Sequence, residues 1–393
     1  MSLTLWELKK IFKRKGILVI ILLLSILNVY NISHNFQDSH SDAYWAIYEE
    51  IKGPFTEDKM NFVMDHYNEY QKIIASGIYE KEVSDPRYYT GFVYGDLNEF
   101  NSHREEMERI FTYNDTIQAV KNAASENIDI YKLKGNQYEM LRNQKISTAY
   151  ETRNLLNYFD TSGFGSYLSY SFSSLLIILV LLFAISPVFT REKELDMDII
   201  IQTCTNGGQK TVFAKKHASL IFTIIISLYF YILDYICFMS VAHLDGLSAP
   251  IYQIREYAFC PLNMSIGQFC MFSLIIKVSG CCVFSMLFLF VSSIYSEILF
   301  SFSINIGISF FLIGFSGSGW NILNPVSFLT NTQYFESFVT MNVFNYPIQN
   351  FILIFLCGAI EFIVFYILIH KTYMSRVAVL RKLRYRKLKT GGK

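Results

Sequence analysis

Six apolar runs, each long enough to cross a lipid bilayer as a helix, divide this chain of 393 residues. A spanning helix needs roughly 20 predominantly apolar residues. The runs are residues 17–33, 166–188, 218–242, 266–292, 298–316 and 349–370. Only 17% of all residues are charged, compared with roughly a quarter in an ordinary soluble domain. The pattern predicts an all-α integral membrane protein with six transmembrane helices.

Acidic and basic residues are segregated along the chain. Residues 34–165 contain 13 Lys and Arg against 22 Asp and Glu. The cations concentrate instead in three short segments, with five in residues 9–15, five in 191–216 and nine in 371–393. Cytoplasmic loops carry an excess of Lys and Arg. With six spans and a cytoplasmic N-terminus over residues 1–16, every basic segment falls inside, including the tail, and the acidic region falls outside.

The region over residues 34–165 is too long for a loop without structure of its own. Thr56 can cap a helix that opens with Glu57, carries apolar side chains at three- and four-residue spacing and stops at Gly77. Further helices are expected over residues 97–111, 116–133 and 137–159. None of the seven Cys lies here, so packing alone would hold this mainly helical extracellular domain. Its 13 Tyr either belong to the core and surface or form an aromatic face for a peptide, lipid or membrane-bound ligand.

The sequence contains no motif that indicates catalysis or metal binding. Gly207 and Gly208 precede Gln209 and Lys210, whereas a phosphate-binding loop needs Gly directly before Lys and another Gly five residues earlier. The acids around Asp196 alternate with cations, which is typical of a solvated helix. The His residues lack the spacing of a zinc site. We expect no enzyme activity, no catalytic residue, no metal and no cofactor in this chain itself.

The connection over residues 189–217 has a distinctive charge pattern. It begins with acids, continues through two Ile to a Thr and Gly turn, and ends with Lys before the third run. The residues that form this pattern are Glu192, Glu194, Ile200, Ile201, Thr203 and Lys215. Acids at the start of a helix and cations at its end complement the helix dipole. Such a short amphipathic helix can lie at the membrane face and dock into a groove of a cytoplasmic partner.

This connection resembles the coupling segment of ABC-2-type transporter permeases. There, a Glu-rich helix, a Thr-containing turn and a Lys before the next span follow one another. The usual Gly after the coupling Glu is Leu195 here, and the common turn Pro is missing before Lys210. The layout is similar too, with six spans and a large insertion between the first two. The resemblance further implies an outer re-entrant loop over residues 243–265 and outer half-helices over 317–348.

The resemblance implies the permease subunit of an ABC exporter for a peptide, antibiotic or lipid-like substrate, with bacteriocin export or self-immunity among its roles. It implies a homodimer or heterodimer of permeases in membrane lipid, and two copies of a separate ATPase subunit that bind ATP and Mg²⁺. We expect the plasma membrane of a Gram-positive bacterium, both termini in the cytoplasm and no nucleic-acid partner. The alternative is a non-transporting receptor or immunity protein whose extracellular helical domain binds a ligand.

Three charged side chains interrupt the apolar runs. They are Asp234 in the third run, Lys277 in the fourth and Glu361 in the sixth. Counted at 1.5 Å per residue from the outer ends, Lys277 and Glu361 reach a similar level near the midplane, and Asp234 lies closer to the outer face. Charges at such depth are costly and usually pair inside a bundle. Either Lys277 and Glu361 form an ion pair that fixes packing, or they line a polar translocation path together with Asp234.

Overall fold

The computed structural model describes residues 2–37, 40–77, 87–203, 207–316 and 321–390, without the side chains of residues 199, 202, 203, 207 and 376–390. Five helical segments in these ranges are long and apolar enough to cross a membrane. They are Lys15–Asn35, Ser162–Glu194, Gly208–Val241, Ile266–Ile294 and Asn350–Ser375. The chain is therefore a mainly helical protein with the character of a membrane protein. The run over residues 298–316 forms a shorter apolar helix, so the sixth span stays a prediction.

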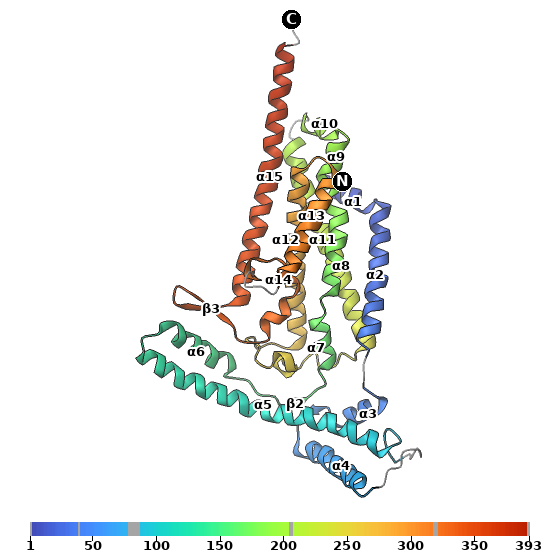
Figure 1. Cartoon of the computed structure of the whole chain (residues 1–393), viewed down its shortest axis with the longest axis vertical. Coiled ribbons are helices and arrows are strands. Elements are labelled where there is room, and N and C mark those ends of the chain that lie inside the picture. The colour runs from blue at the N-terminus through green and yellow to red at the C-terminus, as the bar shows by residue number, and fades with distance from the viewer. Residues whose placement is uncertain (1, 38–39, 78–86, 204–206, 317–320, 391–393) are drawn as a thin grey trace.

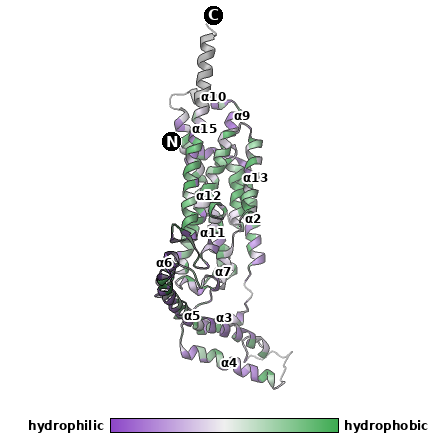
Figure 2. Ribbon diagram, turned by 60° about the vertical axis from the view of Figure 1, so that its left-hand side comes forward, coloured by the Kyte–Doolittle hydropathy of each residue, from purple (hydrophilic) through white to green (hydrophobic). Residues whose placement is uncertain are grey.

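The long helices run side by side along the longest axis of the molecule (Figure 1). The bundle consists of α2 (Lys15–Asn35), α8 (Phe172–Ile185), α11 (Gly207–Val241), α12 (Ile266–Ile294), α13 (Ile298–Gly314) and α15 (Asn350–Thr390). Helix α8 packs against α2, α11, α12 and α13 with Ile177, Val180 and Leu181 fully buried, while its opposite face is exposed. Helix α2 exposes Leu22 and Leu23, and the middle of the bundle is largely hydrophobic (Figure 2). This outward apolar surface fits contact with lipid.

The second apolar run was expected to form one spanning helix, but the structure interrupts it. It is divided into α7 (Ser162–Ser169), α8 and α9 (Pro187–Glu194). Tyr170 adopts an extended conformation with φ −68° and ψ 121°, which ends α7. Pro187 begins α9, where a missing N–H costs nothing because the first turn has no helical acceptor for it. The break leaves the carbonyl group of Tyr170 available to other partners.

The elements of residues 42–158 lie at one end of the bundle (Figure 1). They are α3 (Asp42–Ile51), β1 (Gly53–Pro54), α4 (Glu57–Ala75), α5 (Val93–Leu133), α6 (Gln137–Tyr150) and β2 (Asn157–Tyr158), with β1 and β2 antiparallel. The predicted cap is confirmed, because the Thr56 hydroxyl accepts from the Lys59 N–H at 3.4 Å. The two helices expected over 97–111 and 116–133 are instead one, because no Gly or Pro interrupts residues 93–133 except Gly95 near the start.

The helix expected over residues 137–159 ends at Tyr150, nine residues early. Beyond it, Arg153 is almost completely buried and donates to the carbonyl groups of Cys260 and Leu262. These bonds hold the chain in a turn and direct it into β2. They come from a distant loop, so the local sequence could not predict the end of α6.

Two irregular segments connect this end to the bundle. Residues 243–265 contain the 3₁₀ turns η1 (Ile251–Gln253) and η2 (Arg255–Tyr257), and the Tyr150 hydroxyl donates to Phe259 O at 2.9 Å. The segment before α15 contains η3 (Asn321–Leu323), α14 (Val326–Leu329), η4 (Asn331–Phe335), and an antiparallel hairpin of β3 (Thr340–Val343) and β4 (Tyr346–Gln349). The hairpin was not predicted from the sequence.

Candidate functional site

The predicted coupling segment forms α9, the short helix α10 (Met197–Thr203) and the start of α11. Leu195 and Asp196 join α9 to α10, and Asp196 has a φ of 52°, a left-handed conformation that Asp tolerates better than most residues. The helix α10 and both chain termini lie at the end of the bundle opposite α3 to α6 (Figure 1). The segment therefore lies at the end of the bundle that is farther from the elements of residues 42–158.

Four charged side chains from α1 (Leu3–Phe12), α9 and α11 form an ion cluster, and one of them, Glu192, belongs to this segment. Lys215 on α11 is 1% exposed, and its Nζ lies 3.0 Å from Glu192 Oε1 on α9 and 3.5 Å from Glu7 Oε2 on α1. Lys10 on α1 binds the same two carboxylates, at 3.0 Å from Glu192 and 2.7 Å from Glu7. Two cations and two anions balance, which is the condition for burying charge at acceptable cost. We call Glu7, Lys10, Glu192 and Lys215 the coupling cluster.

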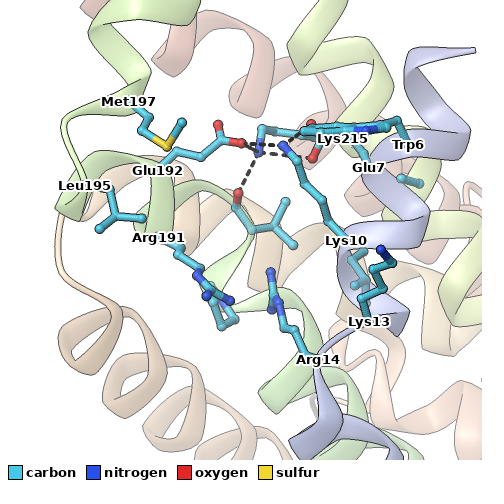
Figure 3. A pocket seen from close by; sticks show the side chains of 14 residues that line it. Trp6, Glu7, Lys10, Lys13, Arg14, Arg191, Glu192, Leu195, Met197 and Lys215 are labelled. Atoms are coloured by element: carbon cyan, nitrogen blue, oxygen red, sulfur yellow. Dashed lines mark hydrogen bonds and ion pairs between the residues drawn. The ribbon is translucent and has the colours of Figure 1, made fainter.

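The coupling cluster borders a cavity of about 430 Å³ between α1, α9 and α11 (Figure 3). Arg14 and Arg191 extend into it below the cluster, and Arg14 also donates to the carbonyl group of Ala184 at 3.1 Å. Burial lowers the pKa of Arg14 to about 10, and the charge of Arg191 acts in the same direction. The cavity leaves α9 loosely packed on one side, so a small movement of α9 meets little steric resistance there.

Two neighbouring side chains fasten α9 to the other side of the bundle. Glu194 Oε1 accepts from the N–H of Ile298 at 2.6 Å, at the start of α13. Lys193 Nζ donates to the carbonyl groups of Ser293 and Tyr295, both at 2.6 Å, at the end of α12. An anion at a helix N-terminus and a cation at a C-terminus are each favoured by the helix dipole. Glu192 and Glu194 thus bind different helices, and α9 connects them.

The helix α10 and the residue Leu195 before it carry exposed apolar side chains. Leu195 is 61% exposed, and Met197 and Ile200 on α10 are 50% and 65% exposed. Ile201 is partly buried, and the side chain of Thr203 lies outside the described residues. Three large exposed apolar side chains on one short segment at the end of a bundle are typical of a protein interaction site.

A second polar cluster lies inside the bundle. Asn28 on α2 is fully buried and donates to Asp234 Oδ1 on α11 at 2.6 Å. Its own amide oxygen accepts from the Tyr170 hydroxyl at 2.7 Å, and the carbonyl group of Tyr170 accepts from Lys277 Nζ at 3.3 Å. We call Asn28, Tyr170, Asp234 and Lys277 the intramembrane cluster. It links α2, the break before α8, α11 and α12.

Lys277 is therefore linked to Asp234 through Tyr170 and Asn28, and no interaction between Glu361 and Lys277 is found among the described residues. Glu361 lies partly buried on α15. Similar depth along two helices does not bring two side chains together when they point to different faces. The proposed Lys277–Glu361 pair is thus not formed in this conformation, and the choice between a packing role and a transport role stays open.

A polar cavity of about 510 Å³ lies where α3 and α5 meet the bundle, and its lining includes Tyr44, Asp160 and Glu256. A second cavity of about 250 Å³ shares Gly165, Ser169 and Glu256 with it and extends to Tyr170. Since Tyr170 belongs to the intramembrane cluster, polar groups continue from the surface at this end into the bundle.

Sequence reasoning missed Glu7, Lys10 and Asn28. Glu7 is the one acid among the first 15 residues, which otherwise carry only cations, and this isolation was an available signal. Asn28 lay in an apolar run and its buried amide had no local partner in sequence. Within the described residues, no group of three or more His, Cys, Asp and Glu is placed to hold a metal ion.

The chain was also compared with family models, with curated proteins and with solved structures, and nothing matched. The functional argument accordingly depends on the geometry of the coupling segment and of the two clusters.

Proposed function

We propose that this chain is the transmembrane permease subunit of an ABC exporter. The observation that carries the proposal is the pairing of an exposed apolar helix, α10, with a buried ion cluster that binds its supporting helix to two others. Leu195, Met197 and Ile200 would enter a groove of a separate ATPase subunit. In this proposal, that separate subunit binds the ATP and Mg²⁺.

Movement of the ATPase subunits would reach the bundle through α9. Glu192 transmits it to α1 and α11 through Lys215, and Glu194 and Lys193 transmit it to α12 and α13. Helices α11 and α12 also carry Asp234 and Lys277, so the same displacement changes the intramembrane cluster. Two rigid elements joined by buried charge pairs have few intermediate arrangements, which suits a switch between two states.

The topology of the proposal follows the charge pattern. Both termini and α10 would face the cytoplasm of a Gram-positive bacterium, and residues 34–165 would face outward. A dimer of permeases, identical or different, would bind two ATPase copies. The cargo would be a peptide, an antibiotic or a lipid-like molecule, which includes a bacteriocin during export or self-protection, and would leave through the outer cavities near Tyr170.

ATPase stimulation tests this function. The chain would be reconstituted in liposomes with a candidate ABC ATPase subunit from the same genome. We expect no ATP hydrolysis by the chain alone, and stimulated hydrolysis in the complex. Ile200→Asp, which places a charge in the docking groove, should reduce the stimulation at least about 10-fold, equivalent to about 1.4 kcal/mol. Leu133→Asp is the matched control, because Leu133 is 90% exposed at the opposite end. Undiminished stimulation by Ile200→Asp would argue against α10 as the coupling element.

A receptor or immunity protein is the second candidate, and the cavity of about 510 Å³ favours it. In that case the helical domain would bind its ligand with full affinity in the absence of any ATPase subunit. Resistance of cells that express the chain alone, unaffected by Ile200→Asp, would support this function over export.

A further inference from the structure

A groove with a volume of about 800 Å³ lies between α1, α11 and α15, at the same end of the bundle as α10. It is separate from the coupling cluster, which lies on the other side of α1 and borders a different cavity. Its lining residues are Leu3, Thr4, Gln209, Lys210, Phe213, Ala214, Lys216, Tyr366, Ile367, His370 and Lys371. Three of these are Lys and none is an acid.

Lys216 is the unusual member of this lining. It is 3% exposed, yet its Nζ has only the ring of Tyr366, at 3.3 Å from the centroid, and the carbonyl oxygen of the same residue at 3.4 Å. No carboxylate pairs with it among the described residues. A buried charge without a counter-ion is costly. The nearby Lys215 differs, because two glutamates neutralise it.

Two of the three cations of the groove, Lys210 and Lys371, lie nearer the end of the bundle than its exposed apolar side chains, and Lys216 lies one turn deeper than Phe213. On α11, Lys210 lies one turn nearer the helix start than Phe213, which is 55% exposed. On α15, Lys371 lies one turn nearer the helix end than Ile367, which is 46% exposed. The two helices run in opposite directions, so both place a cation at the end of the bundle and an apolar side chain one turn deeper.

We propose that this groove binds one anionic phospholipid from the leaflet at this end of the bundle. Lys210 and Lys371 would bind the phosphate group, Lys216 would supply the counter-charge beneath it, and the acyl chains would lie along Phe213 and Ile367. Lipid is the occupant because the groove opens between two candidate spanning helices, where lipid is the surrounding solvent. An acidic protein segment would match the cations but not the exposed apolar side chains one turn deeper.

Native mass spectrometry of the full chain in mild detergent tests this proposal, with phosphatidylglycerol and phosphatidylcholine as probes. We expect one tightly bound phosphatidylglycerol and no equivalent binding of phosphatidylcholine. Each cation near an anionic headgroup contributes about 1 kcal/mol, so Lys210→Gln combined with Lys371→Gln should weaken phosphatidylglycerol binding roughly 30-fold. Lys9→Gln combined with Lys15→Gln removes the same charge from exposed positions outside the groove and should change it less than about threefold.

Lys216→Met gives an independent measurement if the double variant does not fold. Without lipid, this variant should melt at a higher temperature than the wild type, because an uncompensated buried cation is gone. The upward shift of the melting temperature that phosphatidylglycerol produces in the wild type should be smaller in the variant. Equal losses in the groove and control variants, equal binding of phosphatidylcholine, or a lower melting temperature of lipid-free Lys216→Met would each overturn the proposal. The test does not depend on transport, so it also stands if the exporter function fails.

Discussion

Lys215 is the most deeply buried residue of the coupling cluster. It is buried between Glu7 and Glu192, and it also donates to the carbonyl group of Val188 at 2.7 Å. Lys→Met at this position leaves Glu7, which is buried, and Glu192, whose side chain is 15% exposed, paired with Lys10, which is one-third exposed. Removing one partner of a buried ion pair costs about 3 kcal/mol or more.

We therefore expect Lys215→Met to lower the melting temperature and to reduce ATPase stimulation together. Lys9→Met is the control, since Lys9 lies exposed on the same helix as Glu7. Melting of the detergent-solubilised chain measures the first effect. If Lys215→Met behaved like Lys9→Met, the coupling cluster would not bind α9 to α11.

The intramembrane cluster leads to a double-mutant prediction. Asp234→Asn leaves Lys277 as the one charge of the cluster, and Lys277→Met leaves Asp234 as the one charge, hydrogen-bonded to Asn28. We expect each single variant to lower the amount of folded protein in the membrane, and the double variant to restore it. Fluorescence size-exclusion chromatography measures this.

Glu361→Gln distinguishes Glu361 from Asp234 as the partner of Lys277, because Glu361 does not contact Lys277 in this structure. Combining it with Lys277→Met should bring no recovery. Recovery in that combination instead would mean that Lys277 and Glu361 pair in the membrane, as their depth in the sequence predicts. Normal ATP-dependent export by the Asp234→Asn, Lys277→Met double variant would assign the cluster a packing role only.

A buried histidine makes the domain over residues 34–165 sensitive to acid. His103 is fully buried, with the Tyr158 hydroxyl 2.7 Å from Nδ1 and the carbonyl oxygen of Tyr44 3.2 Å from Nε2. Burial lowers the pKa of His103 to about 4. The carbonyl oxygen only accepts, so Nε2 carries the proton of the neutral ring.

The unfolded chain binds a proton at this histidine below about pH 6.5, and the folded chain does so only near pH 4. The contribution of neutral His103 to stability is therefore complete above pH 6.5 and is lost as the pH falls toward 4, by about 3 kcal/mol in total. Between pH 7 and pH 4.5, the melting temperature should fall less for His103→Gln than for the wild type. Parallel curves for the two proteins would show that another group causes the acid sensitivity.

At the scale of the elements, the packing of α14 requires a glycine on each of the two neighbouring helices α12 and α15. A Cβ on Gly280 of α12 would lie 2.4 Å from Cβ of Phe328, and one on Gly358 of α15 would lie 2.1 Å from the ring of the same residue. Phe328 thus occupies the space that two missing side chains leave. The two glycines let α12 and α15 approach α14 closely at this point.

Gly280→Ala should destabilise the chain by about 1 to 3 kcal/mol, because Phe328 has to move out of a packed site. Gly307→Ala on α13 is the matched control, since nothing lies within 4 Å of the added methyl group. It should stabilise slightly, as Ala is the better helix former. Melting temperatures of the two variants measure the difference, and a Gly280→Ala protein as stable as Gly307→Ala would contradict this account of the packing.

How well the sequence predicted each element depended on how local its determinants are. Helix α4 was predicted from its cap Thr56 and its apolar spacing, and both operate within a few residues. The end of α6 was not, because the carbonyl groups that bind Arg153 belong to residues 260 and 262. The hairpin of β3 and β4 turns through Phe344 and Asn345, both with positive φ, and a bulky Phe gives no turn signal in the sequence.

The residues of the two clusters also differ in how local their determinants are. Glu192 and Lys215 were predicted from the charge pattern of one connection, and the structure brings them together at 3.0 Å. Glu7 completes the cluster from a helix 185 positions earlier in the chain than Glu192, a contact that spacing cannot indicate. The partner of Lys277 was predicted from depth alone, and depth leaves the direction of a side chain around its helix undetermined.

At the scale of the whole molecule, the account places the coupling segment and the domain over residues 34–165 at opposite ends of one bundle (Figure 1). In the proposed function, an ATPase subunit bound at α10 would act through α9 on α11 and α12, which carry Asp234 and Lys277. The helix α10 would then be the surface that contacts that subunit.

Site-specific photo-crosslinking measures that contact directly. A benzophenone amino acid would replace Ile200 in one variant and Leu133 in a second variant. Each variant would be produced in cells together with the candidate ABC ATPase subunit. The account predicts a crosslink to that subunit from position 200 and none from position 133, which lies at the opposite end. A crosslink from position 133 alone, or from neither position in a complex that still hydrolyses ATP, would contradict it.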